Sequence, residues 1–327
     1  MIPITDLSWQ SLSWQDQLSS SVRNGKDLTE ALGIKVPELA TDFPINVPLA
    51  YLNRIEPGNP MDPLLLQILA RSEELDPTGV QSPLEEESFN LGHGMIQKYL
   101  GRALIVTTGA CAINCRYCFR RHFPYEETQP STEDWLQIFS RIATDSEIRE
   151  IILSGGDPLM QSDKRLNWIF SQLNKIEHIS TIRIHTRMPV VIPARVTRHL
   201  LQTLESSRPK VVIVNHVNHG NEIDEQVSRA MAHLHDIGAT LLNQSVLLKG
   251  INDSLQTLSE LSRRLHDSGI LPYYLHLLDP VAGAMHFEVD EATGIDLISD
   301  MRDKLPGYLV PRLAREIPHR GSKTLIA

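Results

Sequence analysis

From about residue 103 onward, short apolar runs alternate with amphipathic stretches of helical periodicity. The six apolar runs are the candidate strands Ala103–Thr108, Glu150–Ser154, Thr181–Thr186, Val211–His216, Thr240–Leu247 and Leu271–Leu277. Each run is followed by a stretch that can form a helix, as at Glu133–Ala143, Glu222–His235 and Ser254–Ser268. Strands and helices that alternate in this way predict an α/β fold, with parallel strands joined by covering helices.

Two α/β architectures are compatible with six such units. An open, partial (βα)6 barrel is the preferred interpretation, because six units are too few to close an eight-stranded barrel. A doubly wound open sheet has the same alternation and stays an alternative. In both architectures, we expect the functional residues beyond the carboxyl ends of the strands.

The flanking segments read differently from the alternating region. Residues 1–90 carry helical signals at Leu7–Leu18, Asp27–Leu32 and Pro63–Glu74, so we expect a helical extension that packs on the barrel. The stretch Asp76–Glu87 is rich in turn-forming and acidic residues, which predicts a surface connection close to the boundary. The barrel is expected over 91–305, and residues 306–327 form a short C-terminal segment.

Composition excludes several classes of partner. The net charge of −9 provides no general attraction for nucleic acid or for an anionic membrane surface. No apolar run approaches the roughly 18 residues that span a bilayer. A cytoplasmic protein is therefore expected, with homo-oligomer formation left open.

All three cysteines lie in one loop after the first predicted strand, within TTGACAINCRYCFRR. Their spacing is C-x3-C-x2-C, at Cys111, Cys115 and Cys118. Thiolates suit zinc or iron-sulfur clusters, and a structural zinc ion usually has four protein ligands. His122 or His93 could complete a zinc site. Alternatively, a four-iron cluster with three thiolates would leave one iron open for chemistry.

A second motif, SGGDPL, ends the second predicted strand. Gly155 and Gly156 leave the backbone bare where a ligand could approach closely. The simpler alternative is a tight turn that leads into Asp157 as a helix cap.

The cysteine spacing, with Tyr117 before the last cysteine, resembles the radical S-adenosylmethionine (SAM) superfamily. The resemblance implies a partial radical-SAM barrel and a [4Fe-4S] cluster whose open iron binds SAM. One electron from a reductant protein then cleaves SAM to a 5′-deoxyadenosyl radical. Gly155, Gly156 and Asp157 would form part of the SAM site.

Four longer strings resemble the lysine 2,3-aminomutase family: RIHTRMPVVIP at 183–193, NHVNHGNE at 215–222, NQSVLLKGIND at 243–253 and LPYYLHLLD at 271–279. The likeness extends from about residue 45 to Lys323. The short C-terminus most resembles members that supply β-lysine for modification of elongation factor P.

The family also implies pyridoxal 5′-phosphate (PLP) bound to a lysine near the C-terminus. Here IPHRGSKT resembles that motif and makes Lys323 the candidate, although His319, Arg320 and Ser322 replace glycines of the family pattern. A solvated terminal lysine is the alternative.

The same resemblance implies three substrate-binding residues. Arg120 matches the arginine that binds the amino-acid carboxylate, a task that suits the planar guanidinium. Asp279 and Glu316 match acids that bind the distant ammonium of lysine, with Glu316 replacing a family aspartate. Solvated carboxylates are the alternative interpretation.

Four further residues match family positions around the cofactors. Lys98 and Arg102 correspond to basic positions near the PLP phosphate, where surface charge is the alternative. His216 and Gln244 correspond to positions near the adenosyl group, where hydrogen-bonded polar residues of the barrel interior would look the same.

The resulting hypothesis is an isomerase that converts free L-lysine to β-lysine by radical 2,3-amino migration. A related aminomutase for arginine or glutamate is one alternative. A non-catalytic iron-sulfur or zinc protein is the other.

Overall fold

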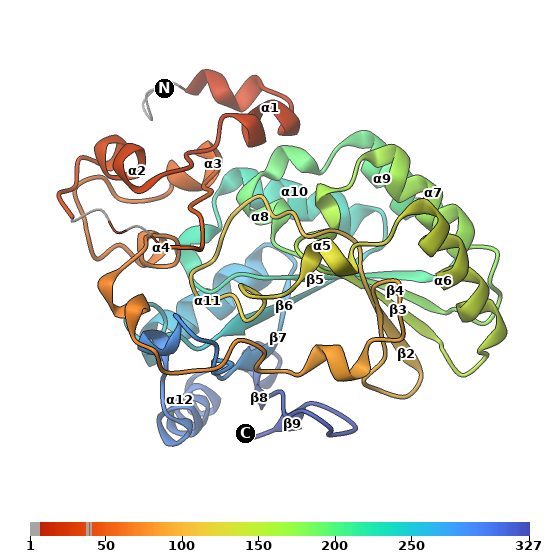
Figure 1. The fold of residues 1–327 in the computed structure, drawn as a ribbon. Coiled ribbons are helices and arrows are strands. Elements are labelled where there is room, and N and C mark those ends of the chain that lie inside the picture. The colour runs from red at the N-terminus through yellow and green to blue at the C-terminus, as the bar shows by residue number, and fades with distance from the viewer. Residues whose placement is uncertain (1–6, 37–38, 40) are drawn as a thin grey trace.

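One curved, open sheet runs through the computed structural model, which describes residues 7–36, 39 and 41–327 (Figure 1). Among these residues, nine strands lie side by side in chain order from β1 to β9. The strands from β2 to β8 pair in parallel, whereas β1 and β9 pair antiparallel at the two edges. The strands are β1 Met95–Ile96, β2 Arg102–Val106, β3 Glu150–Ser154, β4 Thr181–Thr186, β5 Lys210–Asn215, β6 Thr240–Val246, β7 Leu271–His276, β8 Arg312–Arg315 and β9 Thr324–Leu325.

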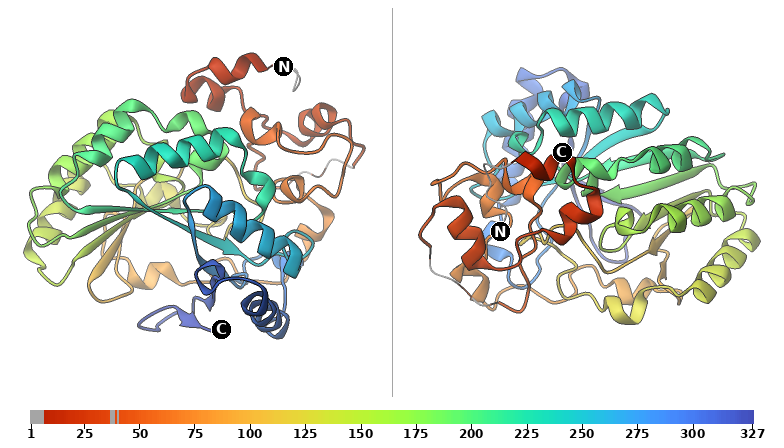
Figure 2. Two further views of the ribbon diagram at one scale, coloured as in Figure 1. Left: turned by 180° about the vertical axis from the view of Figure 1, so that it is seen from behind. Right: turned by 90° about the horizontal axis from the view of Figure 1, so that it is seen from above.

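The predicted partial (βα)6 barrel is confirmed. The six strands from β2 to β7 are each followed by a longer helix, and these helices lie along the outer face of the curved sheet (Figure 2). They are α6 Thr132–Thr144, α7 Asp163–Leu173, α9 Arg198–Glu205, α10 Glu225–Asp236, α11 Leu255–Asp267 and α12 Glu291–Lys304. The sequence pattern did not reveal β8, because RLAR is short and has no β-branched residue.

Helix α6 illustrates how the sequence produces a covering helix. Ser131 caps it by accepting a hydrogen bond from the Asp134 amide. Trp135, Ile138, Phe139 and Ile142 recur at helical spacing and are all buried. The strands use the shorter period of two: along β4, Ile182 and Ile184 are buried in the core, and the alternate residues face the opposite side.

The N-terminal region consists of short helices joined by loops. The described helices are α1 Trp14–Ser19, α2 Gly25–Leu32, α3 Leu49–Leu52 and α4 Pro63–Leu66. The helical signals over Pro63–Glu74 correspond to two short helices, α4 and a 3-10 helix at Ser72–Leu75, with an interruption between them. The carbonyl of Gln67 accepts a hydrogen bond from the Arg116 amide at 2.8 Å, and this tertiary contact replaces a continuing helical bond.

Short helices complete the described chain. The remaining α-helices are α5 Tyr125–Thr128 and α8 Met188–Val191. The 3-10 helices are η1 Leu7–Ser11, η2 Ser72–Leu75, η3 Glu86–Phe89, η4 Pro158–Met160, η5 Pro193–Arg195, η6 Gly220–Glu222, η7 Met285–Phe287 and η8 Gly307–Leu309.

The N-terminal helices and the barrel share one hydrophobic core. Its buried members include Trp14 and Leu28 from the first helices and Ile182 and Leu241 from the sheet. The indole of Trp14 also lies 4.7 Å from the guanidinium of Arg195, which is the last residue of η5 and is buried. The extension is therefore packed against the barrel through both apolar and cation–π contacts.

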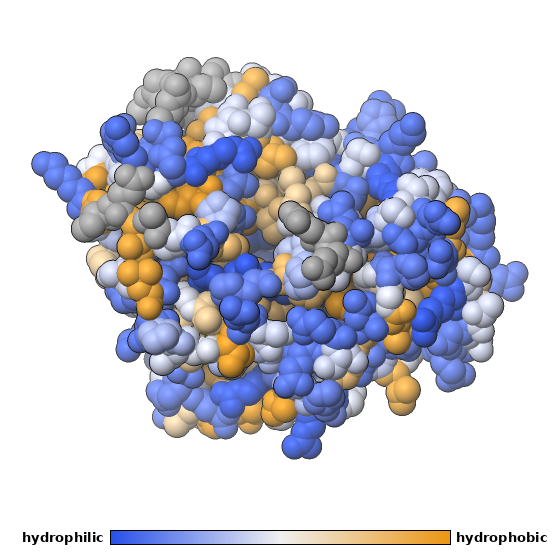
Figure 3. Space-filling view, in the orientation of Figure 1, coloured by the Kyte–Doolittle hydropathy of each residue, from blue (hydrophilic) through white to orange (hydrophobic). Residues whose placement is uncertain are grey.

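Hydrophilic and hydrophobic side chains intermix on the face drawn in Figure 3. Across the described ranges, no helix has the length and apolar character needed to cross a membrane.

Candidate active site

A cavity of about 520 Å³ is lined by side chains of the parallel strands and of the loops beyond their carboxyl ends. All of the residues that the family resemblance assigns to cofactors or substrate line it: Lys98, Arg102, Cys111, Cys115, Cys118, Arg120, Gly155, Gly156, Asp157, His216, Gln244, Asp279, Glu316 and Lys323. The volume is typical of a site for a small molecule or cofactor. Residues far apart in the chain thus meet in one site, as parallel strands require.

The cysteine loop is held from the N-terminal side. The amide nitrogen of Asn46 donates to the carbonyls of Cys111 and Ala112, at 3.1 and 2.9 Å. Burial and the neighbouring thiol of Cys115 together raise the pKa of Cys118 to about 11. Burial likewise raises the pKa of Cys111 above its ordinary value. The thiols of Cys111 and Cys118 therefore carry protons that a bound metal must displace.

Contacts of the two histidines do not favour the zinc alternative. His93 pairs with Asp134 at 2.5 Å, and His122 lies 3.2 Å from the carbonyl of Ala282. Within the described chain, no three His, Cys, Asp or Glu side chains converge closely enough to bind a single metal ion. Three cysteines on one cavity wall instead fit a cluster with several irons.

The glycines of SGGDPL allow the end of β3 to approach the cysteine loop. A Cβ on Gly155, where φ is +118°, would lie 2.5 Å from the carbonyl oxygen of Thr108. A Cβ on Gly156 would lie 2.4 Å from the carbonyl oxygen of Ala110. Both glycines therefore hold the loop in place, and their direct contact with SAM stays a prediction.

The carboxylate of Asp157 is occupied within the protein. It accepts hydrogen bonds from the Leu159 amide at 3.0 Å and the Thr186 hydroxyl at 2.7 Å. The amides of Arg187 and Met188 also donate to it, at 2.8 and 2.9 Å. The helix-cap interpretation is thus confirmed, since Asp157 caps η4 and joins the ends of β3 and β4. These contacts favour a positioning role over direct SAM binding.

Five charged residues form a continuous chain along the cavity wall. Glu86 accepts hydrogen bonds from Arg120 at 2.6 and 2.9 Å and lies 3.5 Å from Lys98. Glu316 then bridges Lys98 at 3.0 Å and Lys323 at 2.7 Å. Burial alone would raise the pKa of Glu316, but Lys323 and Lys98 hold it well below its ordinary value. In this row of ion pairs, each of the five charged side chains has a partner of opposite charge.

The position of Glu86 differs from the surface position that the sequence predicts for it. The stretch Asp76–Glu87 was predicted to be a surface connection, yet Glu86 is buried and binds the guanidinium of Arg120 through two nitrogens. Arg120 also donates to the Ser154 hydroxyl at 3.0 Å and the Gly155 carbonyl at 3.2 Å. Most of its donors therefore have partners, and its contact with a substrate carboxylate stays a prediction.

Asp279 differs from its neighbours because no cation of the described chain lies within ion-pair distance of it. Burial and the negative charge of Glu316 together raise its pKa to about 7. Lys323 and Lys98 act in the opposite direction but do not offset it. Asp279 is thus a carboxyl group that a bound cation would favour in its charged form.

Three residues expected near the cofactors have different surroundings. His216 lies 2.9 Å from the Tyr117 hydroxyl, and burial together with Arg187 lowers its pKa to about 3, so the ring is neutral. Gln244 lies at a register shift between β6 and β7. Arg102 lies beside the Tyr99 ring, 5.4 Å from its centroid, and 4.0 Å from Glu150. Their contacts with cofactors stay predictions.

Two histidines for which the sequence predicts no role line the same cavity. His185 of β4 and His276 of β7 each have a buried Nε2 without a hydrogen-bond partner in the described chain. Burial lowers the pKa of both, so the rings are neutral. Buried polar atoms of this kind are typical of a site that a ligand completes.

Comparison with known proteins agrees with this geometry. The profile described as "Radical SAM superfamily" matches residues 105–261, which include the three cysteines and the strands β3 to β6. A protein named L-lysine 2,3-aminomutase from Escherichia coli (strain K12) is 45% identical over 320 residues, covering 95% of this chain and 93% of the relative. Proteins of the same name from Haemophilus influenzae and Clostridium subterminale are 42% and 32% identical. They cover 100% and 98% of this chain, and 99% and 79% of the respective relatives.

The fold and site thus define a radical SAM protein. Within that class, the chain belongs to the L-lysine 2,3-aminomutase family. Among solved structures, a radical SAM methyltransferase from Sphaerobacter thermophilus overlaps 68% of each chain, with a TM-score of 0.47 and 16% identity. This overlap is weaker than the sequence relationship, on which the family assignment depends.

Proposed function

We propose that this protein converts free L-lysine to β-lysine by 2,3-amino migration, using a [4Fe-4S] cluster, SAM and PLP. The observation that carries the proposal is a single cavity that joins three cysteines to Lys323 and to Asp279, which has no ion-pair partner among the residues that the structure describes. The name of the relatives, L-lysine 2,3-aminomutase, supports the same reaction.

The residues present fit the three cofactors. Cys111, Cys115 and Cys118 would hold the cluster, and Lys323 would hold PLP. When bound, the cluster and SAM would supply a carbon-centred radical, and PLP would hold the nitrogen that migrates. The remaining SAM contacts would come from Gly155, Gly156, His216 and Gln244, with Asp157 positioning the segment. The phosphate contacts would come from Lys98 and Arg102.

The charges of the cavity would orient the amino acid. Arg120 would contact its carboxylate, and Asp279 with Glu316 would contact the ammonium at the end of its side chain. Asp279 supports this assignment because a cation would stabilise a carboxylate that burial otherwise disfavours. Before substrate binds, Glu316 holds the Lys323 amine at 2.7 Å and the Lys98 amine at 3.0 Å.

Chain organisation supports an enclosed reaction site. The extension over residues 1–90 would brace the cysteine loop, because Asn46, Gln67 and Glu74 all contact it. The barrel over 91–305 would provide the cavity, and the segment 306–327 would carry Lys323 to its wall. Enclosure of this kind would limit the access of water to a radical.

The cellular setting follows from the cofactors. A one-electron reductant protein would supply the electron, and the β-lysine would serve modification of elongation factor P. Three unpaired thiols suit the reducing cytoplasm. Nucleic acid and membrane are not proposed as partners, and a homo-oligomer is compatible with the chain.

A direct test compares substrates on the anaerobically reconstituted protein. Lysine should be the best substrate, and glutamate should be poor because its side-chain carboxylate would face Asp279 and Glu316. An aminomutase for arginine is the nearest alternative function, because arginine also has a cationic side chain. Faster conversion of glutamate than of lysine would overturn the proposed substrate.

A further inference from the structure

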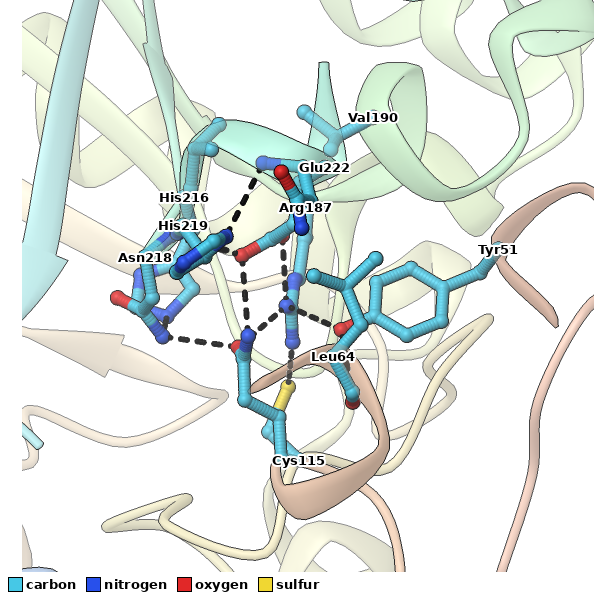
Figure 4. A network of polar contacts seen from close by, with 12 residues as sticks. Tyr51, Leu64, Cys115, Arg187, Val190, His216, Asn218, His219 and Glu222 are labelled. Carbon is cyan, nitrogen blue, oxygen red and sulfur yellow. Dashed lines mark hydrogen bonds and ion pairs between the residues drawn. The ribbon is translucent and has the colours of Figure 1, made fainter. Parts of the chain in front are cut away.

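A buried arginine lies directly behind one of the three cysteines. Arg187 follows β4, and its guanidinium donates to the Cys115 sulfur at 2.7 Å (Figure 4). A second nitrogen of the same group donates to Glu222 at 2.8 Å and to Gln67 at 2.8 Å. The guanidinium thus connects a cluster ligand to a buried carboxylate.

Glu222 is held in place as firmly as Arg187. It has no exposed surface, and its carboxylate accepts the amides of Asn218 at 2.9 Å and His219 at 3.1 Å. Gln67 donates to the same carboxylate at 3.2 Å. These contacts come from the loop after β5 and from the N-terminal extension, so both ends of the ion pair have a fixed geometry.

The backbone of Arg187 is fixed as well. Its amide donates to Asp157 at 2.8 Å, and Asp157 caps η4 beside the cysteine loop. The guanidinium also lies 5.3 Å from the centre of the Tyr51 ring and 5.9 Å from that of Tyr117. Aromatic rings on these sides restrict both water and alternative side-chain positions.

We propose that Arg187 and Glu222 are positioning residues that set the reduction potential of the cluster through the Cys115 thiolate. The inference rests on the proposed function, because it requires a cluster on Cys111, Cys115 and Cys118. Reduction adds one electron from an external one-electron reductant, and no bond forms or breaks in that step.

The sign of each contribution follows from charge. The reduced cluster carries one more negative charge than the oxidised cluster, so an N–H···S hydrogen bond from a cation stabilises it more. Arg187 therefore raises the reduction potential. Glu222 lies on the far side of the guanidinium and opposes part of this effect.

The experiment measures the midpoint potential of the anaerobically reconstituted cluster by an EPR-monitored redox titration, without SAM or substrate. Arg187→Gln should lower the midpoint, and Glu222→Gln should raise it. Arg187→Lys keeps the charge and should fall between the parent and Arg187→Gln. A residue with only a structural role would not move the potential in opposite directions in the two single variants.

Arg195→Gln is the matched control. Arg195 is also buried, pairs with Asp163 at 2.7 Å, and donates to the carbonyl of Leu159 at 2.6 Å. Its loss should reduce stability but leave the midpoint at the parental value. A shift in this control equal to that of Arg187→Gln would overturn the proposal, because any lost buried arginine would then have the same effect.

Loss of Arg187 alone leaves Glu222 buried without a partner and can prevent folding. The double variant Arg187→Gln with Glu222→Gln avoids that charge, and its midpoint should be lower than that of Glu222→Gln. Equal midpoints in these two proteins would overturn the role of Arg187 and leave the cluster assignment intact. A parent protein that assembles no iron-sulfur cluster would instead overturn the proposed function.

Discussion

Replacement of Asp279 by asparagine should stabilise the protein and impair its reaction with lysine. Burial and Glu316 raise the pKa of Asp279 from 3.8 to about 7 in the folded state. A raised pKa means that stability is fully present below the unfolded value of 3.8 and is lost as the pH rises through about 7. Asparagine cannot ionise, so the variant should lack this loss.

The pKa shift of Asp279 determines how much the free energy of unfolding should change. A rise of about three pKa units corresponds to roughly 4 kcal/mol of cost for the charged form. At pH 8, Asp279→Asn should therefore increase the free energy of unfolding of the cofactor-free protein by as much as about 4 kcal/mol. At pH 5, where folded Asp279 is mostly protonated, the gain should be roughly 1 to 2 kcal/mol.

Urea unfolding at pH 5 and pH 8, followed by tryptophan fluorescence, measures both values. Asp290→Asn is the matched control, because Asp290 is the exposed N-cap of α12 and asparagine caps helices equally well. In Asp290→Asn, the free energy of unfolding should not increase relative to the parent as the pH rises. An Asp279→Asn protein with the parental free energy of unfolding at pH 8 would show that burial of the charged Asp279 carboxylate does not destabilise the fold.

The same substitution should weaken the reaction. Loss of one partner of a buried charge pair typically costs about 2 to 5 kcal/mol, so kcat/KM for lysine should fall by about 30-fold or more. Steady-state kinetics under anaerobic conditions check this value. If Asp279→Asn has the parental kcat/KM, Asp279 does not bind the lysine ammonium, even if the variant is more stable than the parent.

Three further substitutions test separate parts of the site. Cys115→Ala should abolish formation of 5′-deoxyadenosine from SAM, because the chain has no cysteine outside the loop to replace a lost ligand; parental formation, measured by chromatography, would contradict the cluster assignment. Lys323→Ala should lose the visible absorbance of bound PLP, and peptide mapping after borohydride reduction of the parent should find the cofactor on Lys323; its discovery on another lysine would reassign the anchor. Gly156→Ala places a Cβ 2.4 Å from the carbonyl oxygen of Ala110, so it should lower the iron content, the Tm and, by about 1 to 3 kcal/mol, the free energy of unfolding. Gly321→Ala is its control, because a Cβ there meets no atom within 4 Å. Equal Tm and iron content in the two variants would show that the close approach of Gly156 to the cysteine loop is not needed.

Periodicity was sufficient to predict the strands and covering helices of the barrel. β3 and β4 begin and end where the apolar runs do, because their alternate residues fill the core. The short β8 could not be predicted, since three of its four residues pair with β7 only through the tertiary fold. The helical stretch over Pro63–Glu74 is interrupted for a related reason, because the Gln67 backbone bonds to the cysteine loop.

The site was predictable where chemistry requires a particular residue type at a particular spacing. The cysteines and glycines have such local patterns, and the family resemblance extended them to Lys323 and Asp279. Glu86 had no such pattern, because it lies in an acidic run that resembles a solvated loop. Its partner Arg120 is 34 residues away, so only the folded chain reveals the pair.

The most direct test of the whole account follows the nitrogen of lysine. Reconstituted protein is incubated anaerobically with a reductant, SAM, PLP and L-lysine that carries an isotopic label in its α-amino group. We expect β-lysine with the label on its β-nitrogen, formed only when all of these components are present. The Lys323→Ala protein should form none. Recovery of unchanged lysine from a protein with a complete iron-sulfur cluster and bound PLP would show that the protein does not catalyse this reaction.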